Sequence, residues 1–172
     1  MKNETELFND VADGHVINTF DPANAGKLHP NIKELIGYIQ NNAENKARPK
    51  RKDLDPADIV RLIPNISILD IRYEGNEVMD VYVRLMGTAM VKVYGEKTGK
   101  MLSDFRSKII SQRMYDTCDM VVKSKSVVVG SVSSFDEEKN FLKLLKVKIP
   151  LFDDDNNPDR VTQIISLIVF SA

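Results

Sequence analysis

The chain has 172 residues, which is the usual size of one domain and leaves no room for a second full one. Apolar residues make up 42% and charged residues 28%, with a net charge of -1, which excludes a disordered chain and an overall basic field for nucleic acid. A single cysteine excludes an internal disulfide, and the lack of a signal peptide or of an apolar run of roughly 20 residues predicts a cytoplasmic protein.

The first part of the chain predicts an arm and then a helix. Residues 1–29 mix isolated apolar residues with Asn, Asp, Gly and Pro, which favours an N-terminal arm. From Pro30 onward, apolar residues follow at positions i, i+3, i+4 and i+7, so we expect an amphipathic helix over residues 30–40. Its apolar stripe consists of Ile32, Leu35, Ile36 and Ile39.

A polar stretch separates this helix from the first predicted strand. Its basic cluster, residues 48–52, is followed at once by acids, which favours a solvated connector over a nucleic-acid site. Asp55 and Pro56 then begin a short helix. We expect it to end before Pro64, because the residue before a proline avoids the helical region.

The middle of the chain predicts a hairpin followed by helices. Residues 66–73 and 78–86 are two β-rich runs joined by a four-residue polar turn, which is typical of an antiparallel hairpin. Gly95 and Gly99 break the next stretch into small helices. The clearest helical pattern of the chain then predicts a helix over residues 107–123. Its apolar face consists of Ile110, Met114, Cys118, Val121 and Val122.

After this helix the sequence returns to the pattern of strands. Residues 126–135, 141–152 and 160–171 are β-rich and are separated by polar turns. Consecutive strands with short connections pair antiparallel, so we expect a five-stranded antiparallel sheet with a helical insert after its second strand. The predicted fold class is therefore α+β, in a single domain.

Several short motifs, in this order along the chain, resemble the single-domain PAS family found mainly in alphaproteobacteria. They are Asp55-Pro56 with Ile59, Leu62-Ile63-Pro64, Arg84-Leu85-Met86-Gly87-Thr88 at a strand end, and Tyr94-Gly95. The resemblance covers about residues 31–172. It implies a PAS fold over residues 30–172, in which an N-terminal helix and a helical insert accompany the antiparallel sheet.

The resemblance also implies a place for a ligand. PAS domains hold small ligands between the inner face of the sheet and the helical insert, and sequence order brings several polar side chains near that space. They are Arg84, Thr88, Tyr94, Tyr115, Ser131 and Ser133. Arg84 could pair with a ligand carboxylate or with a strand acid on the outer face, and strand parity does not decide between them. The tyrosines could instead pack in the core with locally satisfied hydroxyl groups.

Residues suited to catalysis or cofactor binding are scarce in the part that resembles the family. His15 and His29 both fall in the arm, which disfavours a haem, a metal site or a serine hydrolase triad. Cys118 is expected to be a buried core thiol. Residues 153–157 lack the glycine and glutamate of a calcium loop, so a plain turn is favoured. We therefore predict no catalysis, no cofactor and no metal.

The predicted function is that of a stand-alone PAS sensory or regulatory domain, with a small-molecule ligand, a signalling protein partner or both. We expect neither nucleic acid nor a membrane as partner. The output then lies in the partner or in a homodimer, and the stripe of the 30–40 helix is the predicted docking element, with packing on its own sheet as the competing possibility. Two alternatives remain: a small enzyme that uses an acid near Tyr115 as its base, and a ligand-free interaction module.

Overall fold

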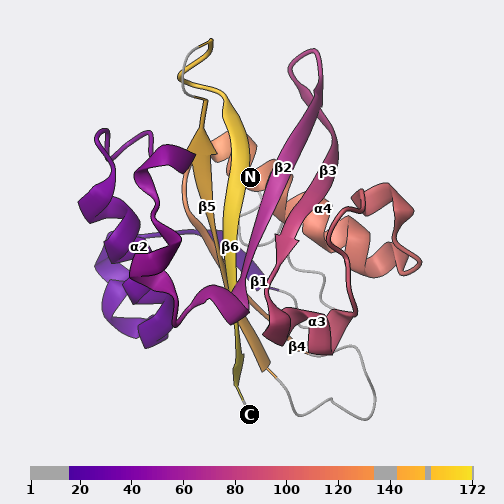
Figure 1. The fold of residues 1–172 in the computed structure, drawn as a ribbon, viewed down its shortest axis with the longest axis horizontal. Helices are drawn as coiled ribbons and strands as arrows, with labels where there is room; N and C mark the ends of the chain where they lie inside the picture. The colour runs from indigo at the N-terminus through magenta and orange to yellow at the C-terminus, as the bar shows by residue number, and fades with distance from the viewer. Residues whose placement is uncertain (1–15, 134–142, 154–155, 172) are drawn as a thin grey trace, which may run out of the picture.

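The computed structural model describes residues 16–133, 143–153 and 156–171, and within them one antiparallel sheet of six strands in the order β1-β4-β5-β6-β2-β3 (Figure 1). The strands are β1 (Val16–Thr19), β2 (Ile66–Glu74), β3 (Glu77–Met86), β4 (Val128–Ser133), β5 (Lys143–Phe152) and β6 (Val161–Ser171). The predicted α+β class and antiparallel sheet are confirmed. The sheet has one strand more than the five that the sequence predicted.

The additional strand is β1, which lies in the stretch expected to be an arm. It pairs antiparallel with β4, and the side chain of Ile17 is buried in the core. Four residues are too few to show a period-2 pattern, which is why the sequence did not predict the strand. A 3-10 helix, η1 (Pro22–Lys27), follows it. Residues 1–15 of the expected arm lie outside the described residues.

The helices confirm the predicted order, with one correction. The insert between β3 and β4 holds α3 (Thr88–Tyr94), the 3-10 helix η5 (Leu102–Asp104) and the long α4 (Lys108–Ser124). Before β2, however, the single short helix expected to end before Pro64 is replaced by two 3-10 helices, η3 (Pro56–Ile59) and η4 (Ile63–Asn65). Pro64 lies within the first turn of η4, where a missing N–H costs nothing.

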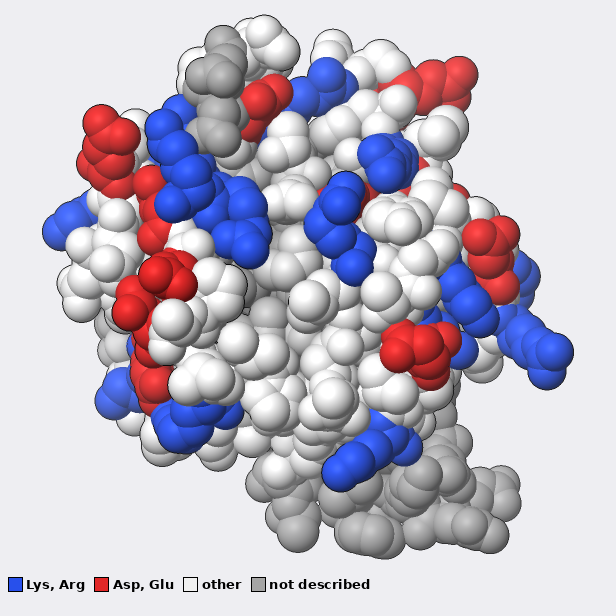
Figure 2. Space-filling view, viewed as in Figure 1, with Lys and Arg blue, Asp and Glu red and all other residues white. Residues whose placement is uncertain are grey.

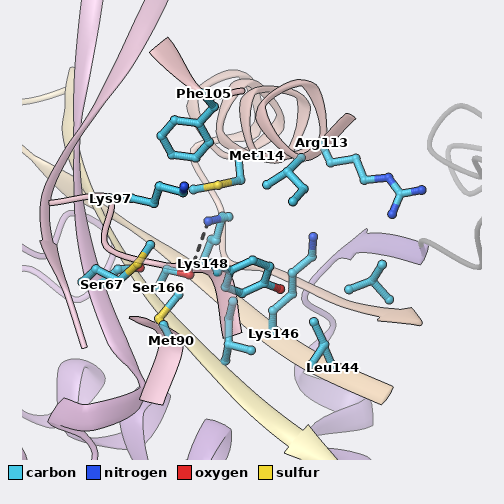
Figure 3. A pocket seen from close by; sticks show the side chains of 15 residues that line it. Ser67, Met90, Lys97, Phe105, Arg113, Met114, Leu144, Lys146, Lys148 and Ser166 are labelled. Carbon is cyan, nitrogen blue, oxygen red and sulfur yellow. Dashed lines mark hydrogen bonds between the residues drawn. The ribbon is translucent and has the colours of Figure 1, made fainter. Parts of the chain in front are cut away.

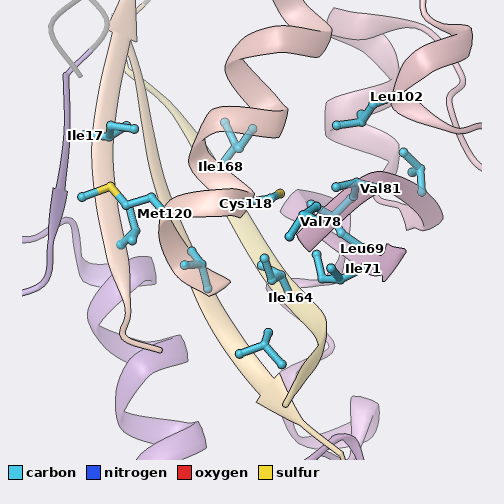
Figure 4. Packing of buried hydrophobic residues seen from close by; sticks show 14 of the residues in the cluster. Ile17, Leu69, Ile71, Val78, Val81, Leu102, Cys118, Met120, Ile164 and Ile168 are labelled. Atoms are coloured by element: carbon cyan, nitrogen blue, oxygen red, sulfur yellow. The ribbon is translucent and has the colours of Figure 1, made fainter. Parts of the chain in front are cut away.

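The sheet is covered on both faces, and each face has its own hydrophobic cluster. Helix α2 (Pro30–Asn42) packs on one face and the α3–α4 insert on the other (Figure 1). Alternation along the strands divides the side chains, so Ile66 and Ile68 of β2 belong to the α2 cluster and Leu69 to the α4 cluster. Figure 4 shows the α4 cluster, with Cys118 among the strand residues.

The stripe of α2 is part of the core. Its four residues, proposed from the sequence as a docking element, are buried against the sheet of their own chain. They are Ile32, Leu35, Ile36 and Ile39. The competing possibility, packing on its own sheet, is therefore what the structure shows, and the stripe needs no second chain to cover it. A homodimer stays a prediction that now lacks this support.

The connector around residues 48–52 is held by contacts with the end of β5 and the turn that follows it. Arg48 forms an ion pair with Asp159, with 2.9 Å between Nε and Oδ1, and its guanidinium lies over the ring of Phe152.

On the face drawn in Figure 2, basic and acidic side chains are interspersed. No helix within the described residues combines the length and the apolar character required to cross a membrane.

Gly87 offers a test of the junction between β3 and α3. A Cβ added there would lie 2.3 Å from the carbonyl oxygen of Pro64 and 2.5 Å from that of Ile63, and neither backbone atom can rotate away. We predict that Gly87→Ala lowers the free energy of unfolding by about 1–3 kcal/mol, as expected for overpacking. The matched control is Gly37→Ala in α2, where a Cβ meets nothing within 4 Å.

The control should raise the free energy of unfolding by about 0.5–1 kcal/mol, because alanine favours a helix interior over glycine. Urea denaturation of both variants and of the wild type measures the difference. Equal effects of the two substitutions would contradict the close approach of η4 to Gly87.

Candidate functional site

A cavity of about 60 Å³ lies between the sheet and the α3–α4 insert. Its walls come from β2, the end of β3, β4, β5 and β6 on one side and from α3, α4 and the loops that flank them on the other. Most of the lining is apolar, and it includes Met86, Met90, Phe105, Ile110, Met114 and Ile168. A volume of this size holds a few water molecules or a small ligand, which makes the cavity the candidate site.

The polar part of the lining is dominated by positive charge. Lys146 and Lys148 are two residues apart on β5 and therefore face the same side, where they are 8% and 4% exposed. Arg113 on α4 is 7% exposed, and Lys97 lies half-buried in the turn after α3. Lysine and arginine are rarely this deeply buried, so the cluster sets this cavity apart from ordinary core.

Serines complete the polar floor of the cavity. Lys148 donates a hydrogen bond from Nζ to Oγ of Ser166 over 3.3 Å (Figure 3). Ser166, on β6, is the register partner of Lys148 on β5 and of Ser67 on β2. The three residues therefore lie side by side across the centre of the sheet. Both serine side chains are fully buried. The result is a row of hydrogen-bonding groups set into an otherwise apolar surface.

Burial and like charge change how two of these groups titrate. The pKa of Lys146 falls from 10.5 to about 7, first because burial disfavours the charged amine and then because Lys148 and Arg113 repel a further positive charge. Burial raises the pKa of Tyr94, also in the lining, to about 12, so its phenol is neutral and can donate a hydrogen bond. Near pH 7 the charge of the cavity therefore changes with the protonation of Lys146.

Of the ligand-binding residues that the sequence suggested, the structure brings Tyr94 to the cavity. Thr88 is exposed at the start of α3, and Tyr115 donates from its hydroxyl group to the carbonyl oxygen of Val78 over 2.8 Å. Neither lines the cavity, and for Tyr115 the alternative of a locally satisfied hydroxyl is what the structure shows.

Arg84 is on the opposite face of the sheet. Its Nε donates to Oδ2 of Asp70 over 2.8 Å, and Gln163 donates to Oδ1 of the same carboxylate over 2.7 Å. Asp70 shares the parity of Ile68, which packs toward α2, so this network faces away from the cavity. The expectation that Arg84 projects into the pocket is corrected: it pairs with a strand acid on the outer face.

The two serines predicted on β4 do not join the site. Ser131 alternates with Val132, and Val132 lines the cavity, so Ser131 points to the other face. Ser133 belongs to the same strand, but its side chain lies outside the described residues. Any direct role of the predicted residues in binding a ligand stays a prediction.

The sequence interpretation missed the basic residues of the site. Lys146 and Lys148 stand on either side of Val147, and lysine on alternate positions of a strand normally indicates a solvated face. What could have revealed them is the position of β5 in the expected topology, since a central strand beneath the helical insert has no solvated face. Arg113 was missed for a similar reason: it lies on the predicted 107–123 helix, of which only the apolar face was expected to be buried.

The remaining candidate chemistry is limited. Cys118 is fully buried as predicted, and burial raises the pKa of its thiol. Nδ1 of His29 accepts a hydrogen bond from the backbone N–H of Asn31, so this histidine caps α2. The described residues contain no group of three His, Cys, Asp or Glu side chains that could hold a metal ion. His15 and residues 154–155 of the predicted turn lie outside the described residues.

A second hollow lies on the α2 side, between that helix and the start of β4. Its volume of about 330 Å³ is larger, but it is more open to solvent, and one of its basic residues, Arg48, already pairs with Asp159. A hollow that is open to solvent, and whose charged side chain already has a partner, holds a ligand less well than a more enclosed one. The cavity beneath α4 is therefore the stronger candidate.

The comparisons with known proteins agree with the geometry. The family model described as "PAS domain" matches residues 27–166, a range that includes every residue named above for the cavity except Ile168. The search of curated proteins found no match to this chain.

The pKa of Lys146 gives a test that needs no ligand. Between pH 7 and 10.5 the unfolded chain keeps a proton on this lysine that the folded chain has lost, so stability should rise with pH across that window. Lys146→Met removes this rise. We predict that the variant is more stable than the wild type at pH 6, by on the order of a few kcal/mol, and that the difference shrinks toward pH 10.

Urea denaturation at intervals of pH measures this difference. Lys92→Met, at an exposed position of α3, is the matched control and should follow the wild-type curve. Parallel curves for Lys146→Met and the wild type would show that the amine of Lys146 titrates normally.

Proposed function

Because the chain belongs to the PAS domain family, whose members are in general non-catalytic sensory or interaction modules, we propose that it is a sensory domain that binds a small molecule in the cavity beneath α4. The observation that carries this proposal is the cavity itself, with mostly apolar walls and a few convergent polar groups. In a domain of this size, a core built only for stability would be filled by apolar side chains.

The lining of the cavity suits a response to a ligand. Met86, Met90 and Met114 are unbranched and polarisable, so they can repack around an added molecule. A ligand that prefers one arrangement of the insert shifts α4 relative to the sheet. Helix α4 also contacts β1, because Ile17 and Met120 belong to the same cluster, so a shift of α4 reaches the N-terminal strand. The N-terminal side of the domain is therefore the proposed route of the signal.

The output of the sensor is proposed to lie in a signalling protein partner or in a homodimer, in the cytoplasm. The alternative of a small enzyme, with an acid near Tyr115 as its base, stays a prediction. The hydroxyl group of Tyr115 donates to the carbonyl oxygen of Val78, and His29 caps α2. The ligand-free interaction module is the alternative that the next experiment separates from a sensor.

Filling the cavity should abolish ligand binding. We predict that ligand-observed NMR with a library of small metabolites finds molecules that bind the wild type and that these no longer bind Val132→Phe, whose ring would occupy the space. Val129→Phe is the matched control, because Val129 lies on the same strand but packs on the α2 cluster. If no library member binds the wild type, or if Val132→Phe binds as well as Val129→Phe, the cavity is not the sensor site.

The homodimer has its own test. Sedimentation equilibrium over a range of concentrations should give a mass approaching twice the 19.5 kDa of one chain. A mass of one chain at every concentration would contradict the homodimer, and the signal would then have to pass to a different protein.

A further inference from the structure

The charges around the cavity have one sign. Lys97, Arg113, Lys146 and Lys148 come from the turn after α3, from α4 and from β5, and none of the described residues that line the cavity is acidic. Bringing amines and guanidinium groups of like charge together in a buried space costs free energy, because each loses hydration and repels the others. An anion inside the cavity would offset that cost.

Lys148 is placed to bind such an anion directly. Its ammonium group carries three N–H donors, and the bond to Oγ of Ser166 uses one of them. Figure 3 shows the amines of Lys97 and Lys148 reaching toward the same space from opposite walls. Ser166 and Ser67 lie beside Lys148 and can donate from their hydroxyl groups. The donors thus converge from strand and turn, as charge-assisted recognition of an oxyanion requires.

The rest of the lining determines what the anion is attached to. Besides Arg113 and Tyr94, the wall opposite the sheet carries apolar side chains, which contact carbon favourably and offer no hydrogen bond to a hydrated inorganic ion. They are Met90, Phe105, Ile110 and Met114. The volume of about 60 Å³ limits the occupant to a small molecule unless the methionines move. A molecule with a short apolar body and one negatively charged end fits both the basic donors and the apolar side chains of the cavity.

From the charges, the donors and the lining we infer that the ligand of this cavity is a small organic anion, a carboxylate on a short apolar body, held by Lys148 and Lys146 with Lys97 beside the apolar wall. The inference rests on the proposed sensory function and names the class of molecule that is sensed. Arg113 contributes to the field of the site from α4.

The protonation of Lys146 makes the binding of such an anion dependent on pH. The charged groups that face its amine are Lys148 on the same strand and Arg113 on α4, with Cys118 also nearby. Without ligand its pKa is about 7, and an anion raises it by favouring the charged amine. Binding should therefore take up a proton above pH 7, and the affinity should be constant below that pH and fall as the pH rises above it.

Calorimetry with matched probes tests the inference. Acetate, butyrate and hexanoate are titrated at constant ionic strength and pH 6.5, each beside its neutral amide, and inorganic phosphate is the probe for an anion without an apolar body. We expect at least one carboxylate to bind about tenfold or more tightly than its amide, and more tightly than phosphate. Repeating the titration at pH 8.5 in buffers of different ionisation enthalpy should show proton uptake that is absent at pH 5.5.

Variants assign the binding to the site. Lys148→Met keeps an unbranched side chain that is one atom shorter and removes the charge, so carboxylate affinity should fall about tenfold or more, whereas the exposed Lys92→Met should bind like the wild type. Circular dichroism verifies that Lys148→Met is folded, and the comparison of carboxylate with amide in the wild type does not depend on any variant.

The outcomes separate this inference from the proposed function. Equal affinities for carboxylate and amide, both lost in Val132→Phe, would keep the sensor and overturn the anion. Phosphate binding as tightly as the best carboxylate would overturn the organic part of the inference. Binding of library molecules without any binding of the carboxylates also overturns it, and failure of every probe and library molecule overturns both proposals.

Discussion

The structure depends on a sheet whose central strands, β5 and β6, are covered on both faces. Each of these strands must divide its side chains between two hydrophobic clusters, so Val147 and Ile165 pack toward α2, and Leu144 and Ile164 pack toward α4. Because neither face is open to water, a polar residue at any of these positions is buried and needs a partner. This constraint explains why the buried polar residues of these strands, such as Lys146, Lys148 and Ser166, call for a chemical explanation.

The two faces meet this constraint in different ways. Toward α2, the carboxylate of Asp70 is neutralised by Arg84 and accepts a further bond from Gln163, which is a paired and satisfied arrangement. Toward α4, positive residues gather around a cavity. Natural sequences depart from a purely apolar core mainly where function requires it, and the second arrangement is such a departure. The stability of the fold and the proposed binding of a ligand therefore make opposite demands on β5.

Much of the fold follows from the sequence because the elements are long and regular. The hairpin, α2, α4 and the last three strands all show the period of their structure over many residues. Strand β1 is too short for such a pattern. The face of Arg84 could not be predicted, because a register shift between the partners of Ile68 and Leu69 changes the alternation of β3. The basic residues of the cavity were missed because lysine on alternate strand positions usually indicates solvent.

Strand β1 has a further consequence for how chains meet. By pairing with β4 it occupies the row of backbone N–H and C=O groups that β4 would otherwise present at the border of the sheet. Such a row is a template for a strand of another molecule, and natural proteins guard it against aggregation. Strand β1 is four residues long, and it contacts α4, the helix that covers the cavity. A displacement of α4 would therefore weaken the packing of β1 on β4 and favour aggregation through the edge of β4.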